Sequence, residues 1–228
     1  MLGVSKNFIQ TSPTQLIGLN PSVWLDASDS NTLYDATTGG NLVAADGAVK
    51  RWEDKSGNAN HAVRNTADGG GARKIARQNG LDAILQDTDD FFELTSNVSG
   101  RTFIVVFKWT YRAAAVFLGH SSLYHFHGPR IGYNELYDIR FASSAVRNGT
   151  QWLNGVEVAG ESTAHTTNWQ VIALRSTSNV SVNRLADDRG IAGRTMNGEY
   201  AEVLMFSSAL SDYQINKLSR ELMRKWGI

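Results

Sequence analysis

GEYAEVLMFSSALSDYQINKLSRELMRKWGI, residues 198–228, is the stretch that decides the fold of this chain. In its first part, residues 199–206, Ala201, Val203 and Met205 alternate with residues that are also mostly apolar. Alternate side chains of a strand point to opposite faces, so both faces of this segment are hydrophobic. A strand of this kind is typical of the interior of a sheet that is covered on both sides. We therefore expect a central strand here.

The second part of the same stretch predicts an α-helix that begins after Ser211. Ser211 is a good N-cap residue, and Gln214, three positions later, completes a capping box. Apolar residues recur at helical spacing as one stripe that would face the sheet: Ile215, Leu218, Leu222 and Trp226. On the solvent side, the spacing favours ion pairs of Glu221 with Lys217 and with Lys225. We expect a short helix docked beside the central strand.

Short apolar runs separated by turn-forming residues occupy most of the preceding chain. The clearest run, residues 102–109, again has two apolar faces, and residues 169–175 and 179–185 predict a hairpin around 176–178. Weaker strand patterns occur at residues 23–25, 49–53, 61–63, 81–85, 91–94, 114–118, 123–126 and 137–141. About a dozen short strands predict an all-β fold, a sandwich of two antiparallel sheets with one C-terminal α-helix.

Composition restricts the class of protein. The 228 residues carry 22 basic and 22 acidic side chains, so the formal net charge is zero, which argues against nucleic acid or an anionic membrane as a partner. The absence of cysteine excludes disulfides and thiolate metal sites. No segment approaches the ~18 apolar residues of a membrane-spanning helix, and the first residues lack the pattern of a secretory signal peptide. We expect a soluble protein made in a cytoplasm.

Two regions are expected along the chain. Residues 1–19 are polar with scattered apolar positions, and predict an N-terminal arm that is disordered or packs loosely, for example on a neighbouring subunit. Residues 20–228 contain no linker and no fixed-period repeat, so we expect them to form one domain.

Five sequence blocks of this domain resemble one known family. They are PSVWLDASD (21–29), RWEDKSGNANHA (51–62), NGLDAILQDTDDFFEL (79–94), TFIVVFK (102–108) and GEYAEVLMFSSALSD…KWGI (198–228). In order and spacing they resemble the LamG-like, concanavalin A-like jelly-roll domains, over residues 20–228. The resemblance implies a two-sheet jelly-roll sandwich that serves mainly as a binding or structural module, often in surface or virion proteins of bacteria and bacteriophages.

The chain departs from this family in two places. Residues 110–165 contain the segment HSSLYHFHGPRIGYNELYD, which matches no block of the family. At 86–88, Gln-Asp-Thr stands where family members often have an Asp-Gly turn. Ligand sites of relatives therefore do not transfer to these positions.

Glycoside hydrolysis requires two carboxylates that flank the scissile bond. Catalytic relatives with this fold carry Glu-x-Asp-x-x-Glu on one strand, but no glutamate of this chain has an aspartate two positions later. Glu199 and Glu202 are three residues apart, so in a regular strand they would point to opposite faces. We expect Glu202 to be partly buried and held by backbone groups or by an arginine. The sequence therefore predicts a protein without catalytic residues or enzymatic activity.

Three aspartates are candidates for a metal site. Asp87, Asp89 and Asp90 could supply oxygen ligands to Ca²⁺, and Asp26 and Asp29 lie elsewhere in the chain. An acidic turn in which aspartates cap backbone groups is the more common use of such a cluster, and no fixed ligand spacing is present. We expect no required cofactor, with Ca²⁺ as the one candidate.

A second cluster combines histidines with aromatic residues. His125 and His127 would share a strand face, as metal-binding histidine pairs do, with His120 nearby but no evident third ligand. Together with Tyr124, the two histidines are better explained as an aromatic, hydrogen-bonded patch that could contact a ligand.

Exposed aromatic side chains can stack on sugar rings. Trp52, Trp109 and Trp169 lie in strand patterns, where packing in the core is expected. Trp152 is flanked by polar turn residues in NGTQWLNG (148–155) and is therefore the best candidate for an exposed, ligand-binding tryptophan.

Two functions fit these observations. The first is a non-catalytic structural module of a bacteriophage virion, such as a capsid decoration or tail-associated protein. Its partners would be other virion proteins or further copies of itself, in a homo-oligomer formed through sheet edges or the arm at 1–19. The second is a lectin-like domain that recognises host surface glycans.

Overall fold

The computed structural model describes residues 18–64, 71–87, 90–111, 116–128, 135–138, 140–164, 166–187, 189–191 and 194–228. The N-terminal arm expected at 1–19 lies outside this set except for its last two residues. None of the helices in the described ranges combines the length and the apolar composition needed to cross a membrane.

Antiparallel strands dominate the described residues, as the sequence predicted. The strands are β1 (Val23–Asp26), β2 (Leu33–Tyr34), β3 (Arg51–Trp52), β4 (Ala62–Val63), β5 (Ala72–Gln78), β6 (Leu81–Gln86), β7 (Phe92–Tyr111), β8 (Leu118–Gly119), β9 (Thr150–Leu153), β10 (Val156–Val158), β11 (Gln170–Leu185) and β12 (Asn197–Phe206). The helices are a 3-10 turn at Ser30–Thr32, α1 (Ser144–Arg147) and α2 (Asp212–Trp226). The prediction of an all-β fold with a C-terminal helix is confirmed.

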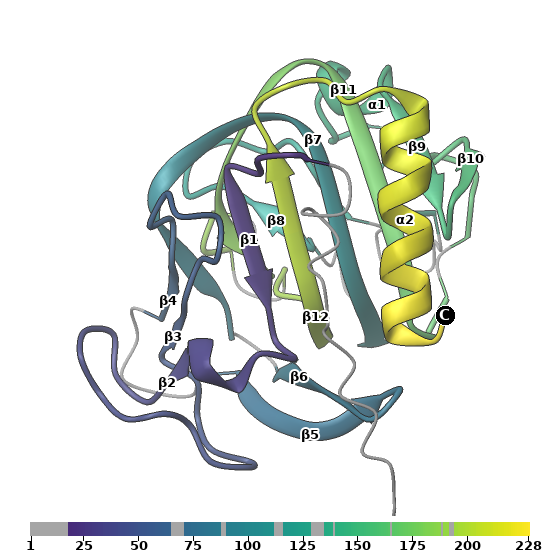
Figure 1. Cartoon of the computed structure of the whole chain (residues 1–228). Helices are drawn as coiled ribbons and strands as arrows, with labels where there is room; N and C mark the ends of the chain where they lie inside the picture. The colour runs from purple at the N-terminus through teal and green to yellow at the C-terminus, as the bar shows by residue number, and fades with distance from the viewer. Residues whose placement is uncertain are drawn as a thin grey trace, which may run out of the picture.

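The strands form one hydrogen-bonded network with the principal order β10-β9-β11-β7-β12-β6-β5. β7 is long enough to serve both layers: its first part pairs with β4 and its later part with β12, while β11 follows it along both. Figure 1 shows β7 curving over the top of the molecule from the back to the front. The two expected sheets are therefore joined through bent strands.

The predicted hairpin around 176–178 is wrong. Residues 170–185 form the single strand β11, whose register against β7 shifts between Arg175 and Val180. The partner strand has Gly100 opposite Val180. A Cβ on Gly100 would lie 3.0 Å from the Phe103 ring and 3.1 Å from the Phe206 carbonyl, so glycine allows the chains to approach closely where the strands bend.

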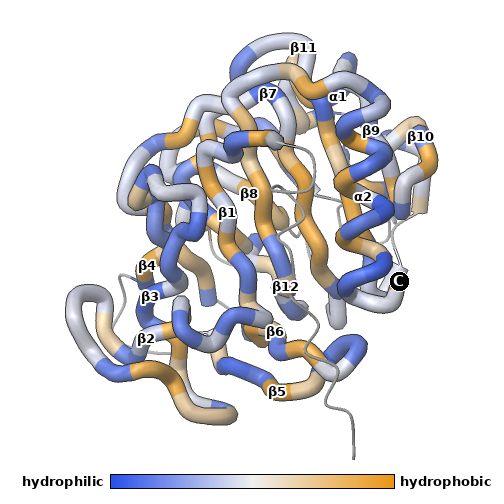
Figure 2. Tube along the Cα trace, viewed as in Figure 1, coloured by the Kyte–Doolittle hydropathy of each residue, from blue (hydrophilic) through white to orange (hydrophobic). Residues whose placement is uncertain are grey.

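Two hydrophobic clusters hold the layers together. The larger lies inside the folded sheet and contains side chains such as Val105, Phe107 and Val203. The smaller lies between the sheet and α2, with Ile104, Val106 and Leu204 on the sheet side. Figure 2 shows hydrophobic stretches along β12 and β7, with hydrophilic and hydrophobic positions alternating along α2. The central strands are thus covered on both faces, as expected.

The helix α2 follows its sequence signals closely. Ser211 and Gln214 form the capping box, and Gly227 ends the helix with a left-handed φ of 66°. The apolar stripe is fully buried: Ile215, Leu218, Leu222 and Trp226. The predicted surface pairs of Glu221 are wrong, because Glu221 binds Arg224 and Lys225 turns inward to the sheet.

A β-bulge interrupts the alternation of β12. The register against β7 shifts between Tyr200 and Glu202, so that Tyr200 packs in the inner cluster while Ala201 packs in the cluster under α2. Glu202 hydrogen-bonds to Trp226, on the side of α2. Glu199 pairs in register with Lys108 on the same side. The prediction that Glu199 and Glu202 face opposite ways is therefore wrong, because a bulge adds one residue to the strand.

Several short elements differ from the expectation. The residues 123–126 and 137–138 have no strand structure, while β5 and the β9–β10 hairpin were not predicted. The hairpin turns at Asn154 and Gly155, with φ angles of 49° and 75°. An Asn-Gly pair is favoured in such two-residue turns because both positions require positive φ.

Candidate functional site

A cluster of buried charges lies between β1, β12 and the last turn of α2. Asp26 and Glu202 are cross-strand neighbours, and Lys225 reaches both carboxylates, at 2.8 Å and 2.7 Å. Lys55 adds a second cation, 3.2 Å from Asp26. Each of the two acids lies within hydrogen-bond distance of the Lys225 ammonium group, which therefore sits between them.

Two indoles complete the surroundings of Glu202. Trp24 Nε1 donates to one carboxylate oxygen at 2.8 Å, and Trp226 Nε1 donates to the other at 2.9 Å. Glu202 is 1% exposed, so these donors and Lys225 replace the water that a buried charge loses. Glu202 is more completely buried than predicted, and its partners are a lysine and two tryptophans instead of backbone groups or an arginine.

Protonation in this cluster reflects burial and charge. Burial raises the pKa of Glu202, and the nearby Asp26 adds to this effect, which Lys225 only partly offsets. Burial also opposes the charged form of Asp26, but Lys225 and Lys55 outweigh it and lower the pKa of Asp26. The pKa of Lys225 is raised because Glu202 and Asp26 outweigh its burial. The cluster therefore acts as an internal ion pair network that fastens α2 to the sheet.

Glu199 is neutralised separately. It is 1% exposed, and its two oxygens accept hydrogen bonds of 2.7 Å each from the Arg77 guanidinium on β5. A fork-like pairing of this kind is the strongest arrangement of an arginine with a carboxylate. The bulge places Glu199 and Glu202 on one face of the strand. Both are held by cations, and they do not line a common pocket.

Two of the three aspartates of the predicted calcium site, Asp87 and Asp90, lie in the described part of the chain. Asp89 lies outside the described residues. Asp90 forms an ion pair with Arg64 and accepts a weak hydrogen bond from the Asp87 backbone N–H at 3.4 Å. Within the described ranges, no group of three histidine or acidic side chains could hold a metal ion. A structural turn accounts for Asp90.

Trp152 is not exposed, and the expectation that it forms a ligand platform is wrong. It is 2% exposed in β9, paired with Ala173 of β11 and packed in the cluster under α2. The polar residues around it belong to the turns at the ends of the strand. The Arg175 guanidinium lies 5.3 Å from the centroid of its ring.

Tyr124, His125 and His127 do not form one face. Tyr124 is 51% exposed, with the Arg189 guanidinium 4.9 Å from its ring centroid. His127 is buried and donates from Nδ1 to the Gly128 carbonyl at 3.0 Å. His125 is half-buried, and burial, with a smaller effect of His120, lowers its pKa. The segment is irregular, so the shared strand face that the spacing suggested does not form.

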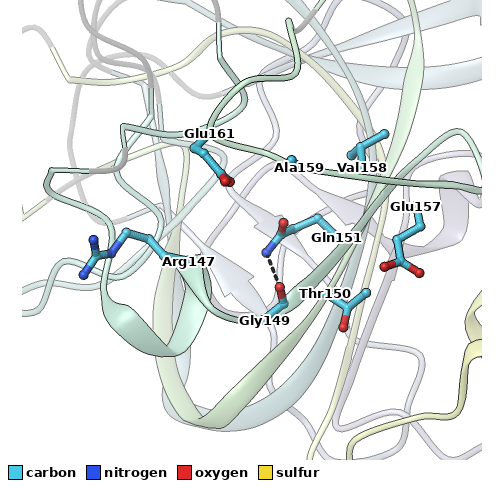
Figure 3. Close-up of a pocket in the computed structure, with 8 residues that line it drawn as sticks. All are labelled: Arg147, Gly149, Thr150, Gln151, Glu157, Val158, Ala159 and Glu161. Carbon is cyan, nitrogen blue, oxygen red and sulfur yellow. Dashed lines mark hydrogen bonds between the residues drawn. The ribbon is translucent and has the colours of Figure 1, made fainter.

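One surface pocket, of about 460 Å³, lies beside α1 and the β9–β10 hairpin. Figure 3 shows Glu157 and Glu161 on opposite sides of it, with Gln151 between them and Arg147 pointing away. The Gln151 amide donates to the Val146 and Gly149 carbonyls, at 3.0 Å and 2.8 Å. The pocket thus offers two exposed acids, but it has no aromatic wall and its central amide N–H groups are occupied.

A second pocket, of about 430 Å³, lies where five segments distant in sequence meet. It is lined by Gln78, Lys108, Asn154, Thr166, Asn168, Trp169, Gly227 and Ile228. Trp169 is half-buried here. It was expected in the core because the sequence pattern placed it inside a strand, but β11 begins one residue later, at Gln170. An aromatic ring together with amides and one cation is the composition of a polar binding site.

Comparisons with known proteins do not assign the chain. No model of a protein family matches it, and no curated protein or solved structure gives a significant match.

Proposed function

We propose that the chain is a non-catalytic binding or structural module that acts through its surface, as a component of a bacteriophage virion. The single observation that carries the non-catalytic part is the neutralisation of buried acids. Among the described residues, the five carboxylates that are at most 5% exposed each have a cationic partner: Asp26 and Glu202 with Lys225, Glu199 with Arg77, Asp138 with Arg140, and Asp187 with Arg184.

Catalysis by a glycosidase would require one protonated acid and one free carboxylate around an accessible space. These five acids are inaccessible and paired with cations. The two acids of the pocket beside α1, Glu157 and Glu161, are exposed, and their side chains make no hydrogen bond or ion pair with the described residues that would hold them in a fixed geometry. A rigid frame without positioned acids favours recognition over bond cleavage.

The edges of the sheet support a role in protein contacts. β10 and β5 end the principal strand order, and each exposes a large apolar side chain, with Val156 64% exposed and Ile75 52% exposed. The segment 46–49 pairs with the first residues of β5, so the exposed apolar side chains, and not a free strand edge along all of β5, are the surface on which another subunit can pack. Self-association or docking on other virion proteins would cover these side chains.

The virion assignment is supported by the five sequence blocks that resemble LamG-like modules of bacteriophages. Mass spectrometry of purified particles of a phage that encodes the chain tests it. We expect stoichiometric amounts of the chain in the particles and lower incorporation of the Val156→Lys and Ile75→Lys variants, with Lys217→Met as a control for surface changes. Particles that lack the chain would reject the proposal.

A lectin-like role is the second candidate, and one observation favours it. The pocket around Trp169 combines an accessible indole with side-chain amides, which is the pattern that carbohydrate recognition uses.

A further inference from the structure

The aromatic wall of the pocket is Trp169, and a second tryptophan holds its ring in place. The Trp169 ring lies nearly parallel to the buried Trp226 ring, at 14° with the centroids 6.4 Å apart. Trp226 is itself fixed by its hydrogen bond to Glu202 and by complete burial. Since one face of Trp169 is turned toward Trp226, its remaining surface is the part that can border the pocket. A ring fixed in this way loses little conformational entropy when a ligand stacks on it.

A positioned hydrogen-bond donor lies in the same pocket. Asn154 sits in the β9–β10 turn, where its Oδ1 accepts from the Val171 N–H at 2.8 Å and its own N–H donates to the Val171 carbonyl at 2.8 Å. The second bond holds the backbone of Asn154, and the first holds its side chain. Its amide nitrogen has no partner among the described residues, so two N–H donors are available to a ligand.

The side of the pocket formed by the loop before β11 and by β5 adds further polar groups. The Asn168 backbone N–H donates to Thr166 Oγ1 at 3.2 Å. The side-chain amide of Asn168 is exposed and is available to a ligand. Gln78 donates to the Gly227 carbonyl at 3.1 Å and retains its amide oxygen as an acceptor. A pocket that offers both donors and acceptors beside an aromatic ring matches the hydroxyl groups of a sugar.

Lys108 supplies the one charged side chain of this pocket among its lining residues. It lies on β7 opposite Glu199, but both oxygens of Glu199 accept from Arg77. Lys108 forms no ion pair with the described residues. An ammonium group without an acidic partner, on a rigid central strand, favours an anionic ligand.

From these groups together we infer that the Trp169 pocket binds an acidic saccharide, with the sugar ring on Trp169 and its carboxylate at Lys108. The inference extends the proposed function, because it requires only that the chain acts by binding. The pocket between Glu157 and Glu161 does not have these properties, since it is lined by two acids and by no aromatic residue.

The test is a titration of the full chain with glucuronate, galacturonate and N-acetylneuraminate, followed by calorimetry and by ligand-observed NMR. Neutral glucose and galactose serve as matched ligands without a carboxylate. We expect an acidic sugar to bind at millimolar or lower concentration, and its affinity to fall as salt rises because the charges are screened.

Variants separate this pocket from the rest of the surface. Trp169→Ala should lower the affinity about tenfold, which corresponds to about 1.4 kcal/mol, because the ring on which the sugar stacks is lost. Lys108→Gln should lower the affinity for the acidic sugar and not for a neutral one. Arg147→Gln, which removes a cation at the other pocket, and Tyr124→Ala, which removes an exposed ring, should leave binding unchanged. Circular dichroism confirms that each variant is folded.

Two results would overturn the inference. One is the absence of binding by every acidic sugar in the panel at millimolar concentration. The other is binding that Trp169→Ala and Lys108→Gln leave unchanged, because the sugar would then occupy a different site. Neither result bears on incorporation into particles, so a failure here is distinct from a failure of the proposed function.

Discussion

The ammonium group of Lys225, in the last turn of α2, lies 2.7 Å from the Glu202 carboxylate in β12. Lys225 is inside the fold even though its spacing from Glu221 is that of a surface pair. It joins the helix to the central strand by charge as well as by the apolar stripe. The ammonium group also contacts the second acid, Asp26, so one cation is shared by two adjacent buried carboxylates.

Removing this cation should be costly. Lys225→Met would leave Glu202 and Asp26 buried without their shared partner, which destabilises a protein by about 3–5 kcal/mol. Arg220→Met, at an exposed position of the same helix, should change the free energy of unfolding by less than about 0.5 kcal/mol. Urea denaturation followed by tryptophan fluorescence measures both. A loss for Lys225→Met no larger than that of the control would show that the network contributes nothing.

Asp26 should contribute a definite part of the acid sensitivity. Its pKa is lowered in the folded protein from the ordinary 3.8, so it stabilises the fold above that value and this contribution is lost as the pH falls through the folded pKa. Below pH 3.8, the stability of the wild type should therefore fall more steeply than that of Asp26→Asn. Denaturant titrations across this range give both slopes, and parallel curves would contradict the prediction.

The test is confined to this range because Glu202 has the opposite effect. The pKa of Glu202 is raised above 4.5 in the folded protein, so its protonated form contributes to the stability of the fold. This contribution is lost as the pH rises through the folded pKa.

Trp152 and Trp169 should behave differently when truncated. Trp152→Ala removes a fully buried ring and should destabilise the fold by about 3–5 kcal/mol. Trp169→Ala should cost less, because part of that ring is already accessible. Thermal or chemical unfolding of the two variants provides the comparison. Equal losses would indicate that Trp169 is as much a core residue as Trp152.

The capping box makes a separate prediction. Ser211→Ala removes the side-chain oxygen that accepts from the Gln214 N–H and should cost about 1 kcal/mol. Ser207→Ala, at an exposed position before the helix, is the matched control and should be close to neutral. If both variants unfold at the same denaturant concentration as the wild type, the cap is not stabilising.

The sequence predicts local features well where the controlling contacts are local. The limits of α2 depend on Ser211, Gln214 and Gly227, which interact within a few residues of the helix ends, and the structure confirms them. The apolar stripe could also be identified, because helical spacing decides which side chains share a face.

Features that depend on distant partners could not be predicted. The bulge after Tyr200 arises from pairing with β7, so the common face of Glu199 and Glu202 is invisible in the sequence of β12 alone. Lys225 turns inward because a buried acid, Asp26, accepts its hydrogen bond. That partner lies about two hundred residues earlier in the sequence. The continuous β11 was interpreted as a hairpin because its polar middle, 176–178, resembles a turn.

The candidate site was the least predictable part. Trp152 has polar neighbours because the Asn154–Gly155 turn is close, and not because the ring is exposed. The Trp169 pocket is assembled from β5, β7, the β9–β10 turn, the loop before β11 and the residues after α2. Lining residues that are spread over five separate segments form no sequence motif. The one signal in the sequence was a tryptophan that directly follows the polar residues Thr166 to Asn168.

The central claim is that this chain binds without cleaving bonds, and the most direct test is an assay for new reducing ends. The purified chain is incubated with β-glucans, polyuronates and sialylated glycans, beside a Glu157→Gln/Glu161→Gln double variant. We predict no release above buffer and no difference between the two proteins. Sustained release by the wild type that the double variant abolishes would contradict the claim and identify the Glu157–Glu161 pocket as an active site.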